Sequence, residues 1–558
     1  MRVTRGAAIA LAGILAAAGL AACSSSGGSG AAHKASATTV LNIGMPNGSQ
    51  TDNNNPFLGS SAGASLGYRF MIFEPLAMTN PVQPSQAPKP WLATKWTWSN
   101  NYQQLVLNIR DGVKWSDGTP MTGDDVVYTF NLMKNTSALN FNALTIGDVS
   151  ASGNTVTMTF PSSQFVNQAK ILSQFIVQKA QWSAIANPAT DTLQKPIGTG
   201  PYTLTSFTPQ TVILNERKSG YWQNLPAPTE LRYTSYTDND AQTTALANGQ
   251  AEWSFVFIPN PKAVYQSKDP THNQLWFPPV LGIHGLWFNT QKAPMNDPIL
   301  RRAIGMVINR NDIFNEGESG YFYPQVTSPT GIPTPAGNSF IDSTYSGQSA
   351  SVDVAGAKTL LTQNGYTYKG STLMDKTGKA VTFTLSDPSG WSDYQTDLEI
   401  IKDNVSQIGI KASVNKANQD AWFKNVDTGN FDAVLHWTNS GATPYDIYQN
   451  IMDGADFKPI GASGVAGNYG RYQNPAATAA LKQYATASDD ATRTAALNTL
   501  EQIMVTEEPM VPLMAANDGG EYVTTHWVGW PSASNPYAPA QPTVTNSLDV
   551  VMHLKPAS

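Results

Sequence analysis

The chain has 558 residues, which is too long for a single hydrophobic core and predicts two or three lobes. Hydrophobic residues make up 41% of it and charged residues 13%, and the formal net charge is -6. This is the composition of a globular protein. Because nucleic-acid binding needs clustered lysine and arginine to neutralise phosphates, the composition argues against a nucleic-acid partner.

Residues 1–22 form a predicted signal peptide. Arg2 and Arg5 give it a positive start, and the apolar run over 7–22 is short for a membrane span of roughly 20 residues. The run ends in Leu-Ala-Ala followed by Cys23, which is typical of a bacterial lipobox. We therefore expect cleavage before Cys23 and a lipid on its thiol. A plain signal peptide with an incidental cysteine is the alternative.

Cys23 is the only cysteine, so no intramolecular disulfide can form. Small polar residues dominate 23–39, a stretch that cannot bury apolar area and is expected to be a flexible tether. No second apolar run has spanning length. We expect a lipoprotein that is extracytoplasmic and held by its lipid at the outer face of the bacterial cytoplasmic membrane, anchored to it rather than spanning it.

Beyond the tether, periodicity predicts a mixed α/β chain without tandem repeats. Thr122 can cap the first long helix, and Gly249 and Gly365 are expected to end later ones. In chain order, the predicted elements are a strand over 38–46, a strand-turn-strand unit over 100–118, a helix over 122–135, a strand over 154–160, a hairpin over 200–217, a helix and strand over 240–257, a helix over 297–314, a helix over 354–366, a strand over 380–387, a helix and strand over 394–417, and a helix and strand over 494–514.

The sequence lacks the motifs of common secreted hydrolases. It has no G-x-S-x-G elbow, no H-E-x-x-H metal pair and no Gly-rich phosphate loop, and its six histidines are scattered. We expect no catalytic residue, no metal and no cofactor. The adjacent carboxylates Asp124-Asp125 and Glu507-Glu508 both fall at predicted helix ends. Asp124-Asp125 falls in a first turn, which favours acidic groups. A glycosidase needs only two carboxylates far apart in sequence, so an enzyme stays an alternative.

Seven segments, in order, resemble the family 5 solute-binding proteins of ABC importers, the oligopeptide-, dipeptide- and nickel-binding group. The strongest, Trp91 to Phe130, follows the pattern P-x-L-A-x-x-W and then L-R-x-G-V-x-F-x-D-G-x-P-x-T-A-x-D-V, with Trp115 and Gly123 where Phe and Ala are frequent. Two others depart at one acid each, with Glu252 and Asn309 where the family has Asp. The remaining six segments are PIGTGPYTLTSF, LNERKSGYW, ALANGQAEW, LWFNTQKAPMNDPILRRAIGMVINRNDI, AKTLLTQNGY and EEPMVPL.

The resemblance implies an α/β fold of the periplasmic-binding-protein-like class II (cluster C), with two main lobes, an extra inserted lobe and a hinge. It implies a monomer that closes around a small-molecule ligand and delivers it to ABC permease subunits, without chemistry of its own. The lobes expected from it are Ia over 40–62, 196–280 and 515–558, Ib over 63–195, and II over 281–514.

The resemblance also places the ligand. In peptide-binding members, an acidic residue three positions after a tryptophan pairs with the peptide's α-ammonium. Here Trp437 supplies the tryptophan, and the position three on is the neutral Ser440. Asp446 is the nearest acid, and a loop shift is needed to bring it in. The ligand-binding candidates are Trp437, Thr438, Asn439, Ser440, Asp446, Trp422 and Asn47.

These candidates favour an oligosaccharide, with an oligopeptide as the close alternative. Tryptophan faces such as those of Trp422 and Trp437 stack on sugar rings, while the polar loop around Asn47 can reach hydroxyl groups. The same mixture of aromatic and polar residues is common to most small-molecule sites. A secreted carbohydrate-active enzyme, and a lipoprotein that senses ligand or chaperones proteins without a transporter, are the alternatives of another class.

Overall fold

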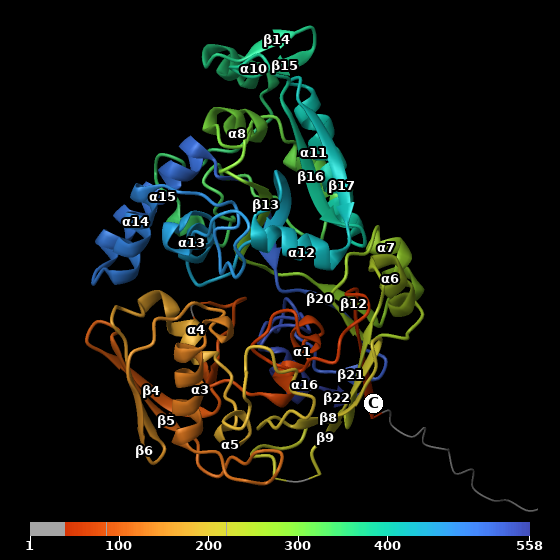
Figure 1. Cartoon of the computed structure of the whole chain (residues 1–558). Helices are drawn as coiled ribbons and strands as arrows, with labels where there is room; N and C mark the ends of the chain where they lie inside the picture. Colours follow the sequence, from red (N-terminus) through yellow and green to blue (C-terminus); the bar gives the residue numbers. More distant parts are fainter. Residues whose placement is uncertain (1–38, 85, 219, 558) are drawn as a thin grey trace, which may run out of the picture. The chain divides into compact units, whose positions relative to one another are not determined.

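The structure, a computed structural model, describes residues 39–84, 86–218 and 220–557. The predicted signal peptide, Cys23 and nearly all of the tether lie outside the described residues. Within the described ranges, no helix is both long and apolar enough to cross a bilayer. The chain is mixed α/β, as predicted, and is built on three larger sheets with helices packed against them (Figure 1).

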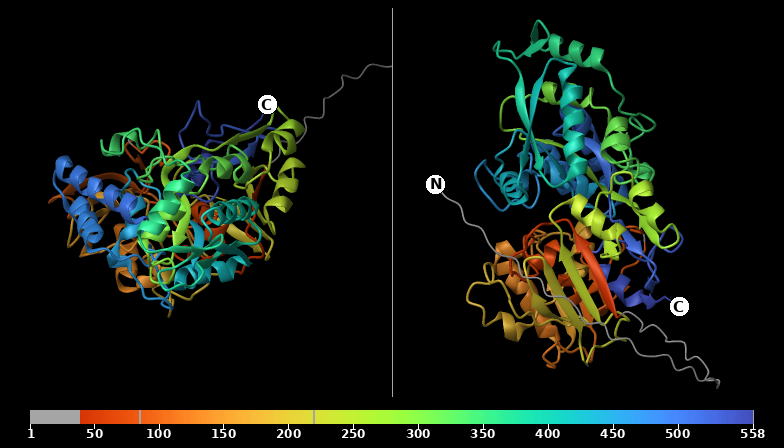
Figure 2. Two further views of the ribbon diagram at one scale, coloured as in Figure 1. Left: turned by 90° about the horizontal axis from the view of Figure 1, so that it is seen from above. Right: turned by 90° about the vertical axis from the view of Figure 1, so that its right-hand side faces the viewer.

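The first sheet has seven strands and collects segments from distant parts of the chain. Its central strand β1 runs parallel to β10 on one side and to β11 on the other, so Leu41 lies beside Leu231 and Ile43 beside Trp253. Figure 2, right, shows β1 next to the yellow strands of this sheet. In spatial order the strands are β12 (Asn273–Trp276), β20 (Gly520–Val523), β11 (Trp253–Ser254), β1 (Val40–Met45), β10 (Glu230–Ser235), β9 (Thr211–Glu216) and β8 (Tyr202–Phe207).

Short helices accompany this sheet. The longest, α6, starts after Asp238, whose carboxylate accepts a hydrogen bond from the Ala241 amide at 2.8 Å and so caps the helix. It ends at Ala247, just before Gly249, as predicted. The helices are α1 (Ala62–Ser65), α2 (Arg69–Ile72), α6 (Asn239–Ala247), α7 (Pro261–Val264) and α16 (Ser547–His553).

The second sheet is a four-stranded antiparallel unit with α3 packed against it (Figure 1). The helix begins directly after Thr122, as predicted. The Asp125 carboxylate caps this start by accepting a hydrogen bond from the Thr122 amide at 2.9 Å, and it also accepts one from the Lys179 amide at 2.9 Å. The strand expected after Gly112 is reduced to a single bridge between Lys114 and Pro120. The elements are β4 (Ala93–Ser99), β5 (Gln104–Ile109), β7 (Thr155–Thr159), β6 (Val149–Ser152), α3 (Gly123–Asn135), α4 (Gln168–Leu172) and α5 (Lys179–Trp182).

The third sheet has five strands. Strand β16 is parallel to β17 and β18, whereas β13 is antiparallel to both β18 and β19. Its elements are β17 (Lys411–Ala417), β16 (Thr382–Pro388), β18 (Ala433–Trp437), β13 (Pro279–Phe288), β19 (Met510–Asn517), α8 (Pro298–Gly305), α9 (Arg310–Asp312), α10 (Val354–Gln363), α11 (Ser392–Ser406), α12 (Gln419–Thr428), α13 (Tyr445–Met452), α14 (Pro475–Thr486) and α15 (Asp490–Glu507). Three two-stranded ribbons complete the set: β2 (Ala77–Met78) with β3 (Lys89–Pro90), β14 (Thr367–Lys369) with β15 (Thr372–Met374), and β21 (Trp527–Val528) with β22 (Lys555–Pro556).

The prediction of a single helix over 297–314 is wrong, because the helix that starts at Pro298 ends at Gly305. A Cβ atom on Gly305 would lie 1.9 Å from a carboxylate oxygen of Glu508, so the chain passes that side chain closely at this point. Asn309 then starts a new turn, since its side-chain oxygen accepts hydrogen bonds from the amides of Asn311 and Asp312 at 3.1 and 3.3 Å.

The chain passes between the first and third sheets twice. It leaves β12 for β13 through residues 277–278, and it leaves β19 for β20 through residues 518–519. The two passages are neighbours, because Pro279 pairs with Asn517. The expected range of lobe II, 281–514, cuts the third sheet, because β13 begins at Pro279 and β19 ends at Asn517. Where each lobe begins and ends remains a proposal.

A buried carboxylate fixes three segments beside the first two sheets. Glu74 is fully buried and accepts hydrogen bonds from the indole nitrogen of Trp91 at 2.7 Å and from the hydroxyl of Tyr221 at 2.8 Å. The indole nitrogen of Trp222 adds two contacts, at 3.2 and 3.1 Å. Burial raises the pKa of Glu74, while these hydrogen bonds lower it. The carboxylate is the common acceptor for donors that would otherwise lack a partner.

We expect Glu74→Ala to reduce the free energy of unfolding by about 3 kcal/mol or more, because three side-chain donors lose their acceptor at roughly 1–3 kcal/mol each. Urea denaturation followed by circular dichroism measures the change. Glu399→Gln is the control, since Glu399 is half-exposed and forms an ion pair with the equally exposed Lys402; its effect should stay within about 0.5 kcal/mol. A loss below about 1 kcal/mol in Glu74→Ala would contradict the role given to this carboxylate.

Candidate ligand-binding site

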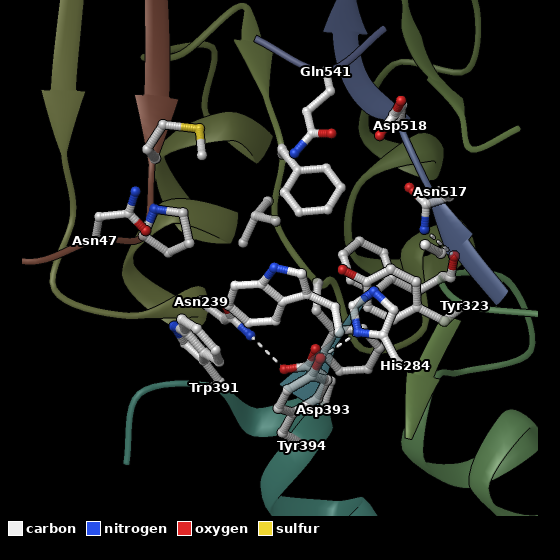
Figure 3. A pocket seen from close by; sticks show the side chains of 18 of the residues that line it. Asn47, Asn239, His284, Tyr323, Trp391, Asp393, Tyr394, Asn517, Asp518 and Gln541 are labelled. Atoms are coloured by element: carbon white, nitrogen blue, oxygen red, sulfur yellow. Dashed lines mark hydrogen bonds between the residues drawn. The ribbon is translucent and has the colours of Figure 1, made fainter. Parts of the chain in front are cut away.

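A cavity of about 340 Å³ lies at the edges of the first and third sheets (Figure 3). From the first sheet it receives residues that follow the carboxyl ends of β1, β10 and β11, which are parallel to one another: Asn47, Asn239 and Phe255. From the third sheet it receives residues that follow β16, β18 and β19. Ligand sites in open α/β sheets form at the carboxyl ends of strands, and here both sheets contribute such an edge.

A second cavity, of about 540 Å³, adjoins the first. The two share Pro46, Asn47, Asn239 and Trp391. The first volume is at the lower end of the range for small-molecule sites, and the second lies within that range, so the pair can hold a ligand of several linked units.

Trp437 lines the first cavity from the end of β18. The imidazole of His436 stacks on its ring at 4.2 Å between centroids, and the rings of Trp391 and Trp422 each lie 6.1 Å away. These contacts fix the orientation of the indole. The side chain is half-buried, which leaves part of it for a ligand.

Thr438 and Ser440 also line the cavity. The Thr438 hydroxyl accepts a hydrogen bond from the Ile283 amide at 3.0 Å, which ties the loop after β18 to β13. Ser440 is exposed and approaches the same strand at Gly282, where a Cβ atom would lie 2.4 Å from the serine hydroxyl. A residue without a side chain at position 282 allows this close approach.

Three of the predicted residues do not line the cavity. The backbone amide of Asn439 donates a hydrogen bond to the side-chain oxygen of Asn450. Trp422 is fully buried behind Trp391 and donates to the Ser386 carbonyl at 3.3 Å. Asp446 is buried in α13, where its carboxylate is 2.9 Å from the ammonium of Lys170 in α4. Asp446 therefore already has a cationic partner within the protein.

Asn47 lines both cavities, as part of the polar loop after β1. Its side-chain nitrogen donates to the backbone carbonyl of Ser65 at 2.7 Å and to the Ser65 hydroxyl at 3.1 Å. These bonds engage the nitrogen of the amide and leave its oxygen as an acceptor. Two further amides that line the first cavity, Asn517 and Gln541, were not singled out from the sequence.

The cavity holds two carboxylates that the sequence did not point to, Asp393 and Asp518 (Figure 3). Asp393 lies in the first turn of α11 and accepts a hydrogen bond from Asn239 at 3.2 Å, which joins α11, beside the third sheet, to the start of α6, beside the first. Burial raises the pKa of each aspartate to about 6. The available signals were weak: Asp518 precedes a Gly-Gly pair at the end of a predicted strand, and Asp393 follows a predicted strand by a short loop.

Burial favours the uncharged form of neighbouring titratable groups. It lowers the pKa of His284, whose ring contacts the Tyr394 hydroxyl, to about 3, so this lining residue is neutral at pH 7. Glu318, Asp387 and Asp397 are fully buried near Asp393, and burial raises the pKa of each well above its usual range. Burial thus favours the uncharged form of these three acids. Among the described residues, no group of three or more His, Cys, Asp and Glu side chains is arranged to hold a metal ion.

The wall of the cavity is mainly aromatic. Phe257 and Phe322 meet edge to face at 5.6 Å, and the Tyr323 ring lies 3.9 Å from the ring of His284. Trp391 crosses Tyr394 at 5.7 Å on the other side. Aromatic walls with a few placed polar groups suit recognition of a small organic molecule.

Comparisons with known proteins agree with this arrangement. Residues 87–459 match the family described as bacterial extracellular solute-binding proteins, family 5 Middle. The periplasmic murein peptide-binding protein of Escherichia coli (strain K12) is 26% identical over 469 residues, which are 77% of this chain and 80% of that protein. The glutathione-binding protein of Salmonella paratyphi A is 26% identical over 337 residues, 58% of this chain, and the chain spans 60% of that relative's length.

A solved structure extends the comparison. The mannohexaose-bound periplasmic oligopeptide-binding protein of an oligopeptide ABC transporter from Thermotoga maritima has a TM-score of 0.83 at 22% identity, covering 93% of this chain and 99% of that one. The fold is thus the periplasmic-binding-protein-like class II, with two main lobes, an extra inserted lobe and a hinge, as the sequence resemblance implied. Since the family match covers well over half of the chain, the protein belongs to the bacterial extracellular solute-binding proteins, family 5.

Proposed function

We propose that this protein is an extracytoplasmic lipoprotein that captures an oligosaccharide between its two main lobes and delivers it to the permease of an ABC importer. The observation that carries the proposal is the cavity at the meeting edges of two sheets, with an aromatic wall and polar groups that follow strand ends. A hinge between the sheets lets such a cavity close over its ligand. We regard the chain as a monomeric binding protein that needs no cofactor.

Three features support the choice of a sugar. Trp391 and Trp437 line the cavity and offer ring faces for the apolar faces of pyranose units. Asn47, Asn517 and Gln541 offer amides, and Asp393 and Asp518 offer carboxylates, for hydroxyl groups. Among the described residues that line the cavity there is no lysine or arginine to pair with a peptide's terminal carboxylate. The ligands named for the relatives range from peptides to mannohexaose, so the fold by itself does not choose.

An oligopeptide is the second candidate, and the two aspartates favour it. Ser440 stands where peptide-binding members carry an acid, but the cavity is not without negative charge, since Asp518 and Asp393 line it. A peptide's α-ammonium needs a carboxylate partner when it is buried. Either aspartate can supply that partner from another segment of the chain.

Calorimetric titration with cello- and xylo-oligosaccharides and with di- to pentapeptides separates the two candidates. We expect micromolar or tighter binding of at least one oligosaccharide series, and recovery of the sugar intact by mass spectrometry after prolonged incubation. Tight binding of peptides and none of sugars would overturn the sugar assignment. Cleavage of the sugar would instead indicate a carbohydrate-active enzyme.

We expect Trp437→Ala to weaken ligand binding about tenfold or more, with little change in melting temperature, because it removes a contact surface worth roughly 1.5–3 kcal/mol from a half-buried side chain. Trp422→Ala is the matched comparison. This fully buried indole should instead lower the free energy of unfolding by about 3–5 kcal/mol. A large loss of stability in Trp437→Ala without loss of affinity would identify Trp437 as a core residue.

Replacing Cys23 tests the lipid anchor. The full-length chain, expressed in a bacterium, should partition into the detergent phase of Triton X-114 because an acyl chain contributes about 0.8 kcal/mol per buried CH₂ group. Cys23→Ser should move it to the aqueous phase, while Ser24→Ala, next to the lipidation site, should not. If wild type and Cys23→Ser partition alike, Cys23 is not the anchor.

A further inference from the structure

The two adjoining cavities are negative in charge. Asp393 and Asp518 line the first, and Asp238, Asp240 and Asp420 line the second. Among the described residues that line either cavity, there is no lysine or arginine. His284, in the first, is held neutral by burial. Clefts lined by one sign of charge focus the field and concentrate ligands of the opposite sign.

Most of these carboxylates are already engaged. Asp238 caps α6, Asp240 and Asp420 lie in first helical turns, and Asp393 accepts from Asn239. Such placements account for an acid without any ligand, because a helix start favours negative charge. The charge count alone therefore does not define a site.

Asp518 is different. Within the described residues, its carboxylate has no hydrogen-bond or ion-pair partner, although its backbone is fixed: its carbonyl accepts from the amides of Ala540 and Gln541 at 3.0 and 3.2 Å. Figure 3 shows it at the cavity beside Asn517 and Gln541. The side chain is half-buried, and losing part of its water without gaining a partner is costly, so burial raises its pKa to about 6. A cation bound there would remove the cost.

The surroundings of Asp518 suit a cation with attached carbon atoms. Phe255, Phe257 and Phe322 line the same cavity, and aromatic faces attract ammonium groups. Tyr323 is only 6% exposed, and its hydroxyl has no hydrogen-bond partner among the described residues. Asp518 is close enough for its charge to add to the effect of burial in raising the pKa of that hydroxyl. The tyrosine is thus a second polar group available to a ligand.

We propose that this cavity recognises a protonated amine, with Asp518 as its charge partner and the aromatic wall around its carbon atoms. The inference rests on the proposed solute-binding function. It narrows the proposed ligands to those oligosaccharides or oligopeptides that carry an amine. Two sources fit that chemistry: an amino sugar in an oligosaccharide, and the free N-terminus of a peptide.

Matched ligand pairs test the proposal on the full mature chain. One pair is a glucosamine tetramer and its fully N-acetylated form, and the other is an alanine tetrapeptide and its N-acetylated form. Calorimetry at pH 7 should give at least about tenfold tighter binding of the free amine in one pair, as expected for a charge-assisted hydrogen bond. The pair that shows the preference identifies the source of the amine.

Variants assign the preference to Asp518. Asp518→Asn should abolish the difference within the pair while keeping the binding of the acetylated member. Asp148→Asn, at a carboxylate that is 98% exposed and contacts only Lys134, should leave the difference unchanged. A preference of the same size in Asp518→Asn would overturn the assignment.

The pH dependence gives an independent readout. The groups around the amine site are Asp393, also with a pKa raised to about 6, the neutral His284, and Tyr323 with a raised pKa. In the free protein Asp518 has a pKa of about 6, and a bound cation favours its ionised form. Affinity for the amine should therefore be full above pH 7 and decline as the pH falls below 6, whereas the acetylated ligand should respond less.

The outcomes separate this inference from the broader function. Equal affinity for both members of a pair would overturn the amine proposal and leave solute binding intact. If no member of either pair binds, the amine proposal fails, while the titration with cello- and xylo-oligosaccharides still decides the proposed solute-binding function.

Discussion

The pairing of β13 with β19 is the constraint on which the rest of the molecule depends. These antiparallel strands carry the chain into and out of the third sheet, and their ends, Pro279 and Asn517, are partners. Because both passages between the sheets run side by side, the two sheets can turn about one line without breaking the pairing. His284 and Ala516 lie on this pair and line the cavity, so part of the cavity wall belongs to the connection itself.

The site follows from strand direction. Parallel strands within each sheet end at the same edge, so the short loops after β1, β10 and β11 meet those after β16, β18 and β19. Loops at such edges carry polar groups that no sheet neighbour satisfies, whereas the strands behind them are apolar. The hydrogen bond between Asn239 and Asp393 is one place where polar groups from the two edges meet directly. The polar residues in these loops can therefore change without altering the strands behind them.

Much of the fold could be predicted from the sequence, because local signals and topology agree. The cap at Thr122 and the alternation in β1 depend on neighbouring residues and were recognised. The break at Gly305 was not recognised; there the chain passes close to Glu508, which is far away in the sequence. For the site, Trp437, Thr438, Ser440 and Asn47 were found to line the cavity. Asp393 and Asp518 were missed, since isolated aspartates have no pattern until tertiary structure surrounds them, and the partner of Asp446 is likewise set by tertiary contact.

The ion pair between Lys170 and Asp446 bears on how easily the four-stranded and five-stranded sheets can move apart. It joins α4, which accompanies the four-stranded sheet, to α13, which accompanies the five-stranded one, and both side chains are mostly shielded from water at 19% and 8% exposure. Separating the helices requires both charges to regain their hydration shells, and salt screens a shielded pair less than an exposed one. Moving α4 away from α13 therefore carries a desolvation cost that comes from outside the cavity.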